Sequence, residues 1–164
     1  MLNVDQINAL ERHEFTNVLA HVFEHSPWIA ARTEAKRPFR NRAELFAALC
    51  DTVMKAMNDE KLCLIRAHPD LVGEAALTDE SQREQTQAGL GTLTPVEAKQ
   101  FREYNAAYKD RFGFPFVICA RLNKKEAILQ AFPIRLKHSR EKEMEIALGE
   151  IFKIADLRLQ DLCK

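Results

Sequence analysis

Apolar residues recur at steps of three and four along most of the chain, which is the period of an amphipathic helix. Near the N-terminus the residues that follow this step are Ile7, Leu10, Val18, Leu19, Val22 and Phe23. They predict one helix from about Val4 to His25. Near the C-terminus the same step joins Met144, Ala147, Leu148, Ile151, Ile154 and Leu162. They predict a long final helix.

Polar residues in front of these apolar stretches predict where helices begin. Thr78 can cap a helix that runs to Ala88, and Thr94-Pro95-Val96-Glu97 combines a cap, a proline at the first helical position and a capping glutamate. Asn123, with Glu126 three residues later, predicts another helix start, and Ser139 can cap the final helix.

Glycines and prolines predict where the helices end. Pro69 disfavours helical backbone at His68, so a helix that begins near Glu60 has to end there. Gly113 predicts the end of the helix that starts at Thr94, and residues 114–120 are then extended or irregular. With no internal repeat or linker, the pattern predicts an all-α protein: residues 1–164 form a single-domain helical bundle of about seven to nine helices, with one extended segment near 114–120.

The charge balance narrows the class of partner. Lys plus Arg and Asp plus Glu number 24 each, so the net charge of zero argues against nucleic acid and against an anionic membrane surface, and favours a small-molecule substrate. No apolar run approaches the roughly 20 residues that span a bilayer, and the N-terminus lacks the features of a signal peptide. We therefore expect a cytoplasmic location, with the four cysteines reduced in the core.

Three segments carry candidate chemistry. The first, Arg66 to Leu71, places His68 at a helix exit fixed by Pro69, where an imidazole can act as a general acid or base. Composition alone favours a plainer alternative, in which Asp70 caps the following turn and His68 is partly exposed.

The second segment follows Thr78. Ser81, Glu84 and Gln85 stand at i, i+3 and i+4, so a hydroxyl, a carboxylate and an amide share one helix face. This face can form a polar wall of a pocket. For a helix this hydrophilic, however, the pattern alone favours a solvated surface.

The third segment, from Phe101 to Ala120, ends in an aromatic extended stretch that suits a planar polar heterocycle, although core packing explains the rings equally well. His21 and His25 stand at i and i+4, but no third ligand completes a metal site and a surface helix is the better interpretation. The sequence thus predicts no metal.

Taken together in this order, the three segments resemble the OHCU decarboxylase family, which acts on 2-oxo-4-hydroxy-4-carboxy-5-ureidoimidazoline in urate breakdown. The specific parts are RAHPDL at 66–71, the Ser81, Glu84 and Gln85 pattern before Ala88-Gly89-Leu90, and Asn105-x-x-Tyr108-x-x-Arg111-Phe112-Gly113-Phe114-Pro115-Phe116. The resemblance implies an all-α fold, decarboxylation to (S)-allantoin without a cofactor, and a homodimer.

The resemblance also implies roles for individual residues. His68 matches the catalytic histidine and Glu84 the catalytic carboxylate. Substrate-binding positions match Pro69, Ser81, Gln85 and Arg135, and backbone groups meet the ligand at Phe116 and Ile118. After the Arg135-Leu136 pair this chain has Lys137, His138 and Ser139, where the family tends to have an asparagine, and Pro133 predicts an interruption of the helix before Arg135.

The implied chemistry needs neither metal nor pyridoxal, because electrons released with carbon dioxide can flow into the adjacent ring C=N of the substrate. Two other hypotheses stay open at this point. One is a helical module that binds a ligand or protein without turnover. The other is a different lyase or hydrolase at the same site.

Overall fold

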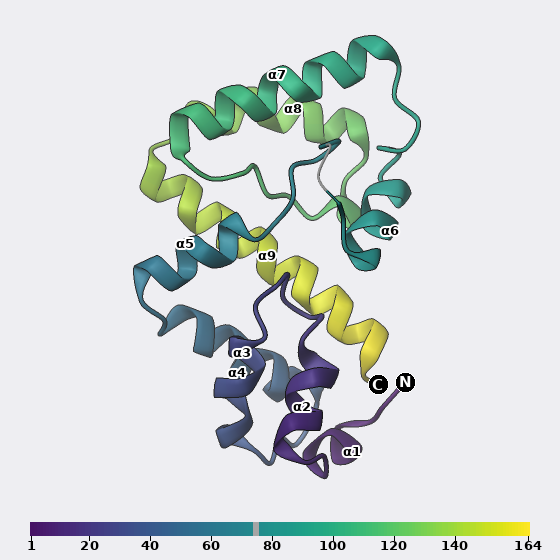
Figure 1. Ribbon diagram of the computed structural model, residues 1–164, viewed down its shortest axis with the longest axis vertical. Helices are drawn as coiled ribbons and strands as arrows, with labels where there is room; N and C mark the ends of the chain where they lie inside the picture. The colour runs from purple at the N-terminus through teal and green to yellow at the C-terminus, as the bar shows by residue number, and fades with distance from the viewer. Residues whose placement is uncertain (74–75) are drawn as a thin grey trace. The chain divides into compact units, whose positions relative to one another are not determined.

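The computed structural model describes residues 1–73 and 76–164, which form helices joined by loops (Figure 1). Over these residues the elements are α1 (Val4–Asn8), α2 (Arg12–Leu19), α3 (Trp28–Thr33), η1 (Glu34–Lys36), α4 (Arg42–Met54), α5 (Asn58–Arg66), α6 (Asp79–Gln87), α7 (Pro95–Phe112), η2 (Ala120–Leu122), α8 (Lys125–Arg135) and α9 (Arg140–Leu162). The predicted all-α class is confirmed, and the number of α-helices in the described part of the chain lies within the predicted range.

Contacts along the chain divide it into two compact units. Unit 1 is Met1–Ala67 with Phe152–Lys164, and unit 2 is His68–Ile151. The helix α9 contributes residues to both. The sequence predicts one domain over residues 1–164, and this stays a prediction.

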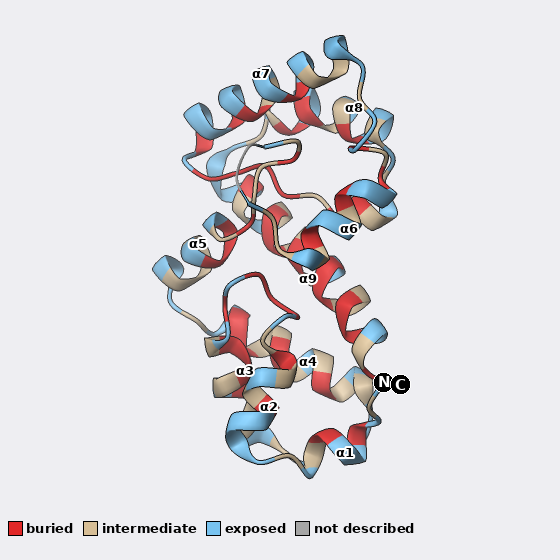
Figure 2. Ribbon diagram, turned by 45° about the vertical axis from the view of Figure 1, so that its right-hand side comes forward, coloured by how far each residue is buried: buried red, intermediate tan, exposed pale blue. Residues whose placement is uncertain are grey.

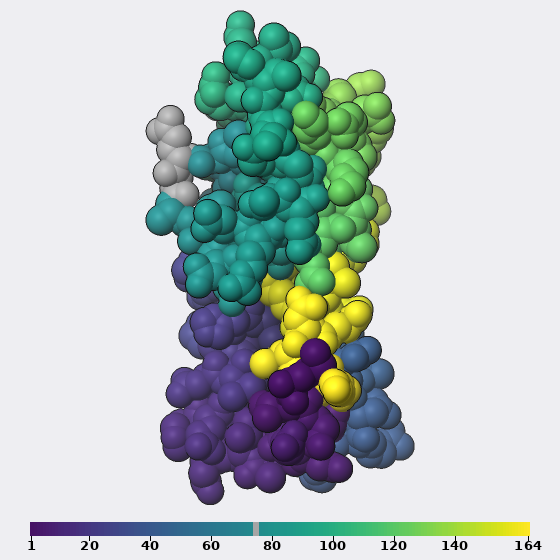
Figure 3. Space-filling model, turned by 90° about the vertical axis from the view of Figure 1, so that its right-hand side faces the viewer, coloured from purple at the N-terminus to yellow at the C-terminus, as the bar shows by residue number. Residues whose placement is uncertain are grey.

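Unit 1 packs α3 against both α2 and α4, around a fully buried apolar core. The most buried members of this core are Ile7, Phe15, Ile29, Leu45, Leu49, Val53, Leu64, Ile65, Ala155 and Leu159. The two ends of the chain meet in this unit (Figure 3): the Leu2 N–H donates to the Leu162 carbonyl at 3.0 Å, and the Lys164 N–H donates to the Leu2 carbonyl at 2.9 Å.

The helix predicted over residues 4–25 is two helices, α1 and α2. The chain leaves α1 at Ala9, and a second capping arrangement starts α2, because the Glu11 N–H donates to the Glu14 carboxylate at 3.1 Å. The one-helix prediction is therefore wrong. His21 and His25 lie beyond the end of α2, and His25 has a left-handed φ of 45°, so they do not lie on a surface helix as predicted.

Unit 2 contains α6, α7, α8 and the first part of α9. In α7 the buried residues Phe101, Asn105, Tyr108 and Phe112 form one stripe, opposite an exposed face (Figure 2). The predicted cap at Thr94 is confirmed, since its Oγ1 accepts from the Glu97 N–H at 3.2 Å. Gly113 ends the helix with a φ of 78°, a left-handed conformation that glycine adopts without steric cost.

The aromatic residues after Gly113 are buried against α7 and α8, which pack side by side (Figure 1). The Phe116 ring stacks on Phe132 of α8 with 3.8 Å between centroids, and meets Tyr108 of α7 edge-on at 5.3 Å. Residues 114–119 are neither helix nor strand, as predicted. Core packing thus explains the position of the Phe116 ring.

Two predictions about α8 are wrong. Asn123 does not cap it, because the Asn123 side chain donates to the Cys119 carbonyl at 2.9 Å and the helix begins at Lys125. Pro133 does not interrupt it, because α8 continues through Arg135. The proline removes one N–H donor near the end of the helix, and the next turn still closes with a 2.9 Å bond from the Leu136 N–H to the Phe132 carbonyl.

The cysteines only partly follow the prediction. All four are free thiols, and Cys119 and Cys163 are buried. Cys63 is exposed and Cys50 half-buried, so the expectation that all four lie in the core is wrong. Among the described residues, no helix has both the length and the apolar character that crossing a bilayer requires.

Candidate active site

His68 begins a turn that α6 and α7 hold in place. The side chain of His68 is buried, with 7% of the residue exposed, which excludes the partly exposed alternative. The Val72 N–H donates to Gln85 Oε1 of α6 at 3.2 Å, and Asn105 Nδ2 of α7 donates to the Leu71 carbonyl at 2.7 Å. The path of the backbone after His68 is therefore fixed by side chains from two helices.

The same turn carries an ion pair and a strained residue. Asp70 Oδ2 accepts from Lys109 Nζ of α7 at 2.8 Å, so this carboxylate pairs with a lysine rather than capping the turn. Val72 has a φ of 57°, a left-handed conformation that β-branched residues rarely adopt and that costs about 1–3 kcal/mol. The contacts to α6 and α7 hold this conformation.

The polar face of α6 is turned into the protein. Thr78 caps the helix as predicted, since its Oγ1 accepts from the Ser81 N–H at 3.2 Å. Ser81 and Gln85 are buried and Glu84 is half-buried, so this face is not a solvated surface. Since Gln85 Oε1 bonds to Val72, its amide Nε2 is the part that can donate to a ligand.

The α6 helix packs against η2, which follows the aromatic segment. Electrostatics reflect this proximity: burial first, and then the negative charges of Glu150 and Glu84, raise the pKa of the Cys119 thiol despite opposing backbone hydrogen bonds. Cys119 itself donates its N–H to Glu150 at 2.9 Å. Glu84 therefore lies near the segment that carries Phe116 and Ile118.

The extended segment after Gly113 has backbone N–H groups that can donate to a ligand. Within the described part of the chain, the N–H groups of Phe116 and Ile118 form no hydrogen bond, whereas the Val117 carbonyl accepts from Arg135 Nη1 at 2.6 Å. Phe116 is buried and Ile118 is half-buried. These N–H groups fit the expectation that backbone groups at Phe116 and Ile118 meet a ligand.

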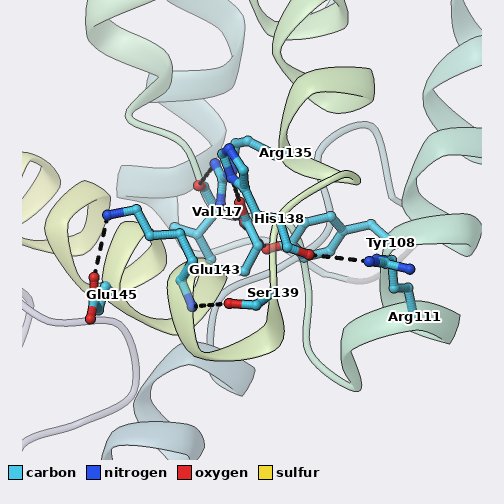
Figure 4. A network of polar contacts seen from close by, with 9 residues as sticks. Tyr108, Arg111, Val117, Arg135, His138, Ser139, Glu143 and Glu145 are labelled. Carbon is cyan, nitrogen blue, oxygen red and sulfur yellow. Dashed lines mark hydrogen bonds and ion pairs between the residues drawn. The ribbon is translucent and has the colours of Figure 1, made fainter.

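Arg135 is buried, and most of its donors bond to the protein (Figure 4). Its Nε and Nη2 lie 2.9 and 2.8 Å from Glu143 Oε2 of α9, and its guanidinium carbon lies 4.1 Å from the centre of the Phe116 ring. Nη2 also lies 3.4 Å from the Tyr108 hydroxyl. Of the five N–H donors of an arginine, one on Nη1 is left for a ligand.

Glu143 is the buried centre of this network, with no exposed surface. It accepts from Arg135, from the Tyr108 hydroxyl and, through Oε1, from His138 Nδ1 at 2.8 Å. Burial raises the pKa of the Glu143 carboxyl, but the hydrogen bonds from Arg135, Tyr108 and His138 outweigh it and hold that pKa below its ordinary value. Glu143 is therefore an ionised partner for the Arg135 guanidinium.

Sequence reasoning missed Glu143 and the role of Asn105. Asn105 and Tyr108 belong to a motif that the sequence singles out, but nothing in their spacing indicates a bond to Leu71 or to Glu143. Glu143 lies in a run of charges at the start of α9 that resembles a solvated helix face. Three-dimensional proximity alone distinguishes it from its exposed neighbours.

No group of three or more side chains suited to holding a metal ion occurs within residues 1–73 and 76–164. His21 and His25 are both exposed. All the residues expected in the site, from His68 to Arg135, lie in unit 2.

Known proteins match this chain over nearly its whole length. The family model described as OHCU decarboxylase matches residues 8–160. The 2-oxo-4-hydroxy-4-carboxy-5-ureidoimidazoline decarboxylase of Halalkalicoccus jeotgali is 41% identical over 161 residues, which are 98% of this chain and 92% of that protein.

Two solved structures are similar as well. The structure of (S)-allantoin synthase matches with a TM-score of 0.82 and 29% identity, covering 100% of this chain and 54% of that one. A structure of OHCU decarboxylase in the presence of (S)-allantoin matches with a TM-score of 0.70 and 28% identity, covering 84% of this chain and 91% of that one. Because the family model spans residues 8–160 and a named relative is 41% identical over 98% of the chain, the chain belongs to the OHCU decarboxylase family.

Proposed function

We propose that the chain is a carboxy-lyase that converts 2-oxo-4-hydroxy-4-carboxy-5-ureidoimidazoline to (S)-allantoin and carbon dioxide in urate degradation. Family membership supports this activity, because the family model covers residues 8–160 and so includes every residue expected in the site. The observation that carries the proposal is the bond from the Val72 N–H to Gln85, which joins the turn after His68 to the helix that bears Glu84.

The reaction breaks the bond between the carboxylate and the ring carbon that also bears the hydroxyl. The electron pair of that bond forms a double bond to the adjacent ring carbon, the pair of its C=N bond moves onto the ring nitrogen, which takes a proton, and carbon dioxide leaves. Loss of the hydroxyl proton then yields the ring carbonyl, and protonation of the neighbouring carbon on one face sets the S configuration. The substrate accepts the electrons itself, so the protein has to orient it and move protons.

His68 takes the substrate hydroxyl proton or holds it by a hydrogen bond. Glu84 fixes the tautomer and the charge of the His68 imidazole. Positioned acid-base groups of this kind contribute about a hundredfold to ten-thousandfold to a rate. The burial of His68 favours this role, because a buried imidazole in a fixed turn has a defined orientation.

The remaining residues bind and orient the planar substrate. Ser81 and the Gln85 amide donate from α6, and the backbone N–H groups of Phe116 and Ile118 donate from the extended segment. Pro69 lines the pocket beside His68. Arg135 contributes its remaining Nη1 donor toward ring or ureido oxygens, and its other donors hold the Val117 carbonyl and Glu143.

Turnover of the freshly made substrate tests the proposal. Urate oxidation generates the unstable intermediates, and the protein is then added while carbon dioxide release and the circular dichroism of allantoin are followed. The proposed activity gives faster release than in the protein-free solution and a signal of one sign, that of (S)-allantoin. A non-catalytic binding module leaves both at the protein-free level.

Two further proposals concern the state of the protein. We expect a homodimer and a cytoplasmic location. Sedimentation equilibrium checks the first: a dimer has twice the 18.8 kDa mass of the chain. Fractionation of cells that produce the protein checks the second.

A further inference from the structure

We infer that Glu143 is a positioning residue for substrate binding, which acts by holding the Arg135 guanidinium and, through it, the backbone between Phe116 and Ile118. The inference rests on the proposed function, because it assigns Glu143 to the same site. Glu143 itself has no exposed surface, so it acts without touching the substrate.

Glu143 orients the guanidinium of Arg135. Nε and Nη2 of Arg135 both face Glu143 Oε2, at 2.9 and 2.8 Å, and a planar group held at two nitrogens has a fixed plane. The Phe116 ring lies against the guanidinium, 4.1 Å from the guanidinium carbon. Glu143 therefore determines where the opposite edge of the guanidinium, with Nη1, points.

The Nη1 edge of the guanidinium in turn holds the backbone that is expected to face the ligand. Nη1 donates to the Val117 carbonyl at 2.6 Å, and Val117 lies between the two residues whose N–H groups are expected to meet the substrate. A shift of the guanidinium would move or release this carbonyl. Glu143 thus controls both the remaining Nη1 donor and the two neighbouring N–H groups.

Two further side chains orient Glu143 itself. The Tyr108 hydroxyl and His138 Nδ1 bond to its two oxygens, one from α7 and one from the loop between α8 and α9 (Figure 4). Together with Arg135 of α8, side chains from three elements therefore bond to the Glu143 carboxylate. These bonds fix the position of the Glu143 carboxylate, so Glu143 does more than neutralise the charge of Arg135.

The test is Glu143→Gln, which keeps the size of the side chain and removes its charge. Interactions that substrate and transition state share equally appear in KM, so we expect KM to rise between about tenfold and hundredfold while kcat changes little. The matched control is Glu145→Gln, two residues along α9, whose side chain is 73% exposed. It should leave both constants unchanged.

A merely structural role predicts a different pattern. It predicts a lower melting temperature with KM unchanged in the folded fraction, and that result would overturn the inference. In an Arg135→Lys background we expect Glu143→Gln to raise KM no further, because the group it positions is already altered. Full additivity of the two rises would also overturn the inference.

Tyr108→Phe covers the case in which Glu143→Gln does not fold. It removes one hydrogen bond to the carboxylate and leaves the buried ring and the ion pair in place, and we expect a smaller rise of KM in the same direction. An unchanged KM in Tyr108→Phe would then overturn the inference. Absence of turnover in the wild-type protein would instead contradict the proposed function, so the two failures are distinguishable.

Discussion

At the scale of the residue, position on a helix face separates the candidate carboxylates where residue type does not. The α6 helix carries three carboxylates, Asp79, Glu80 and Glu84. Only position on the helix assigns Glu84 to the face of Ser81 and Gln85. The structure buries that face. The assignment of Glu84 can therefore be tested against its neighbour on the same helix.

We predict that Glu84→Gln lowers the decarboxylation rate by about a hundredfold or more, because it keeps hydrogen-bonding reach but removes the charge that supports His68. Steady-state turnover measures this loss. Glu80→Gln, one turn earlier, is the control and should retain most of the activity. Equal losses at the two positions would mean that the face assigned to the pocket is wrong.

Local patterns singled out His68, Ser81, Glu84 and Gln85 as candidates, because a helix exit before proline and an i, i+3, i+4 face can be recognised within a few residues, but only the family resemblance assigned them to a site. Sequence reasoning did not reach Glu143. The partners of Glu143, at Tyr108 and Arg135, lie on other helices, so no spacing along the chain indicates the contact. The two N–H groups of Arg135 that face Glu143 are likewise visible only in three dimensions.

At the scale of the element, helix starts were more predictable than interruptions. Thr78, Thr94 and Ser139 cap helices as predicted, because a cap is a local bond between a side chain and an N–H three residues on. The break between α1 and α2 was missed because apolar residues recur at steps of three and four on both sides of it. Whether a residue such as Asn123 caps a helix depends on a competing partner, here the Cys119 carbonyl.

The α7 helix gives the clearest element-scale prediction, since Asn105 holds the turn that follows His68. We predict that Asn105→Ala lowers the free energy of unfolding by about 1–3 kcal/mol, because the buried Leu71 carbonyl loses its donor. We also expect a loss of turnover, because the turn that fixes His68 loosens. Chemical denaturation and turnover measure the two effects.

Gln100→Ala is the matched control for Asn105→Ala. Gln100 lies on the exposed face of the same helix, where substitutions usually change stability by no more than about 0.5 kcal/mol. If the two variants were equally stable and equally active, the bond from Asn105 to Leu71 would have no part in holding the site.

At the scale of the whole molecule, helix content was predictable and the grouping of helices was not. The chain contains few glycines and prolines, and its apolar residues recur at steps of three and four. Both features indicate helices throughout. The division at Ala67 and His68 follows from contacts between distant segments, such as the return of residues 152–164 to unit 1, and those contacts have no signature in local sequence.

We predict that decarboxylation survives exhaustive chelation, because the substrate supplies its own acceptor for electrons. Turnover before and after dialysis against a chelator measures this. A loss of activity that added zinc or magnesium restores would contradict the mechanism, and it would direct attention back to metal-ligating side chains such as His21 and His25.

The central claim is that His68, held in the turn between α5 and α6, moves the proton that decarboxylation requires. The most direct measurement compares wild-type protein and His68→Asn on freshly generated substrate, with circular dichroism of allantoin and thermal melts recorded for both. We expect the wild type to form (S)-allantoin rapidly and His68→Asn to remain at the protein-free rate with a cooperative melt. A folded His68→Asn variant with near-wild-type turnover would contradict the account.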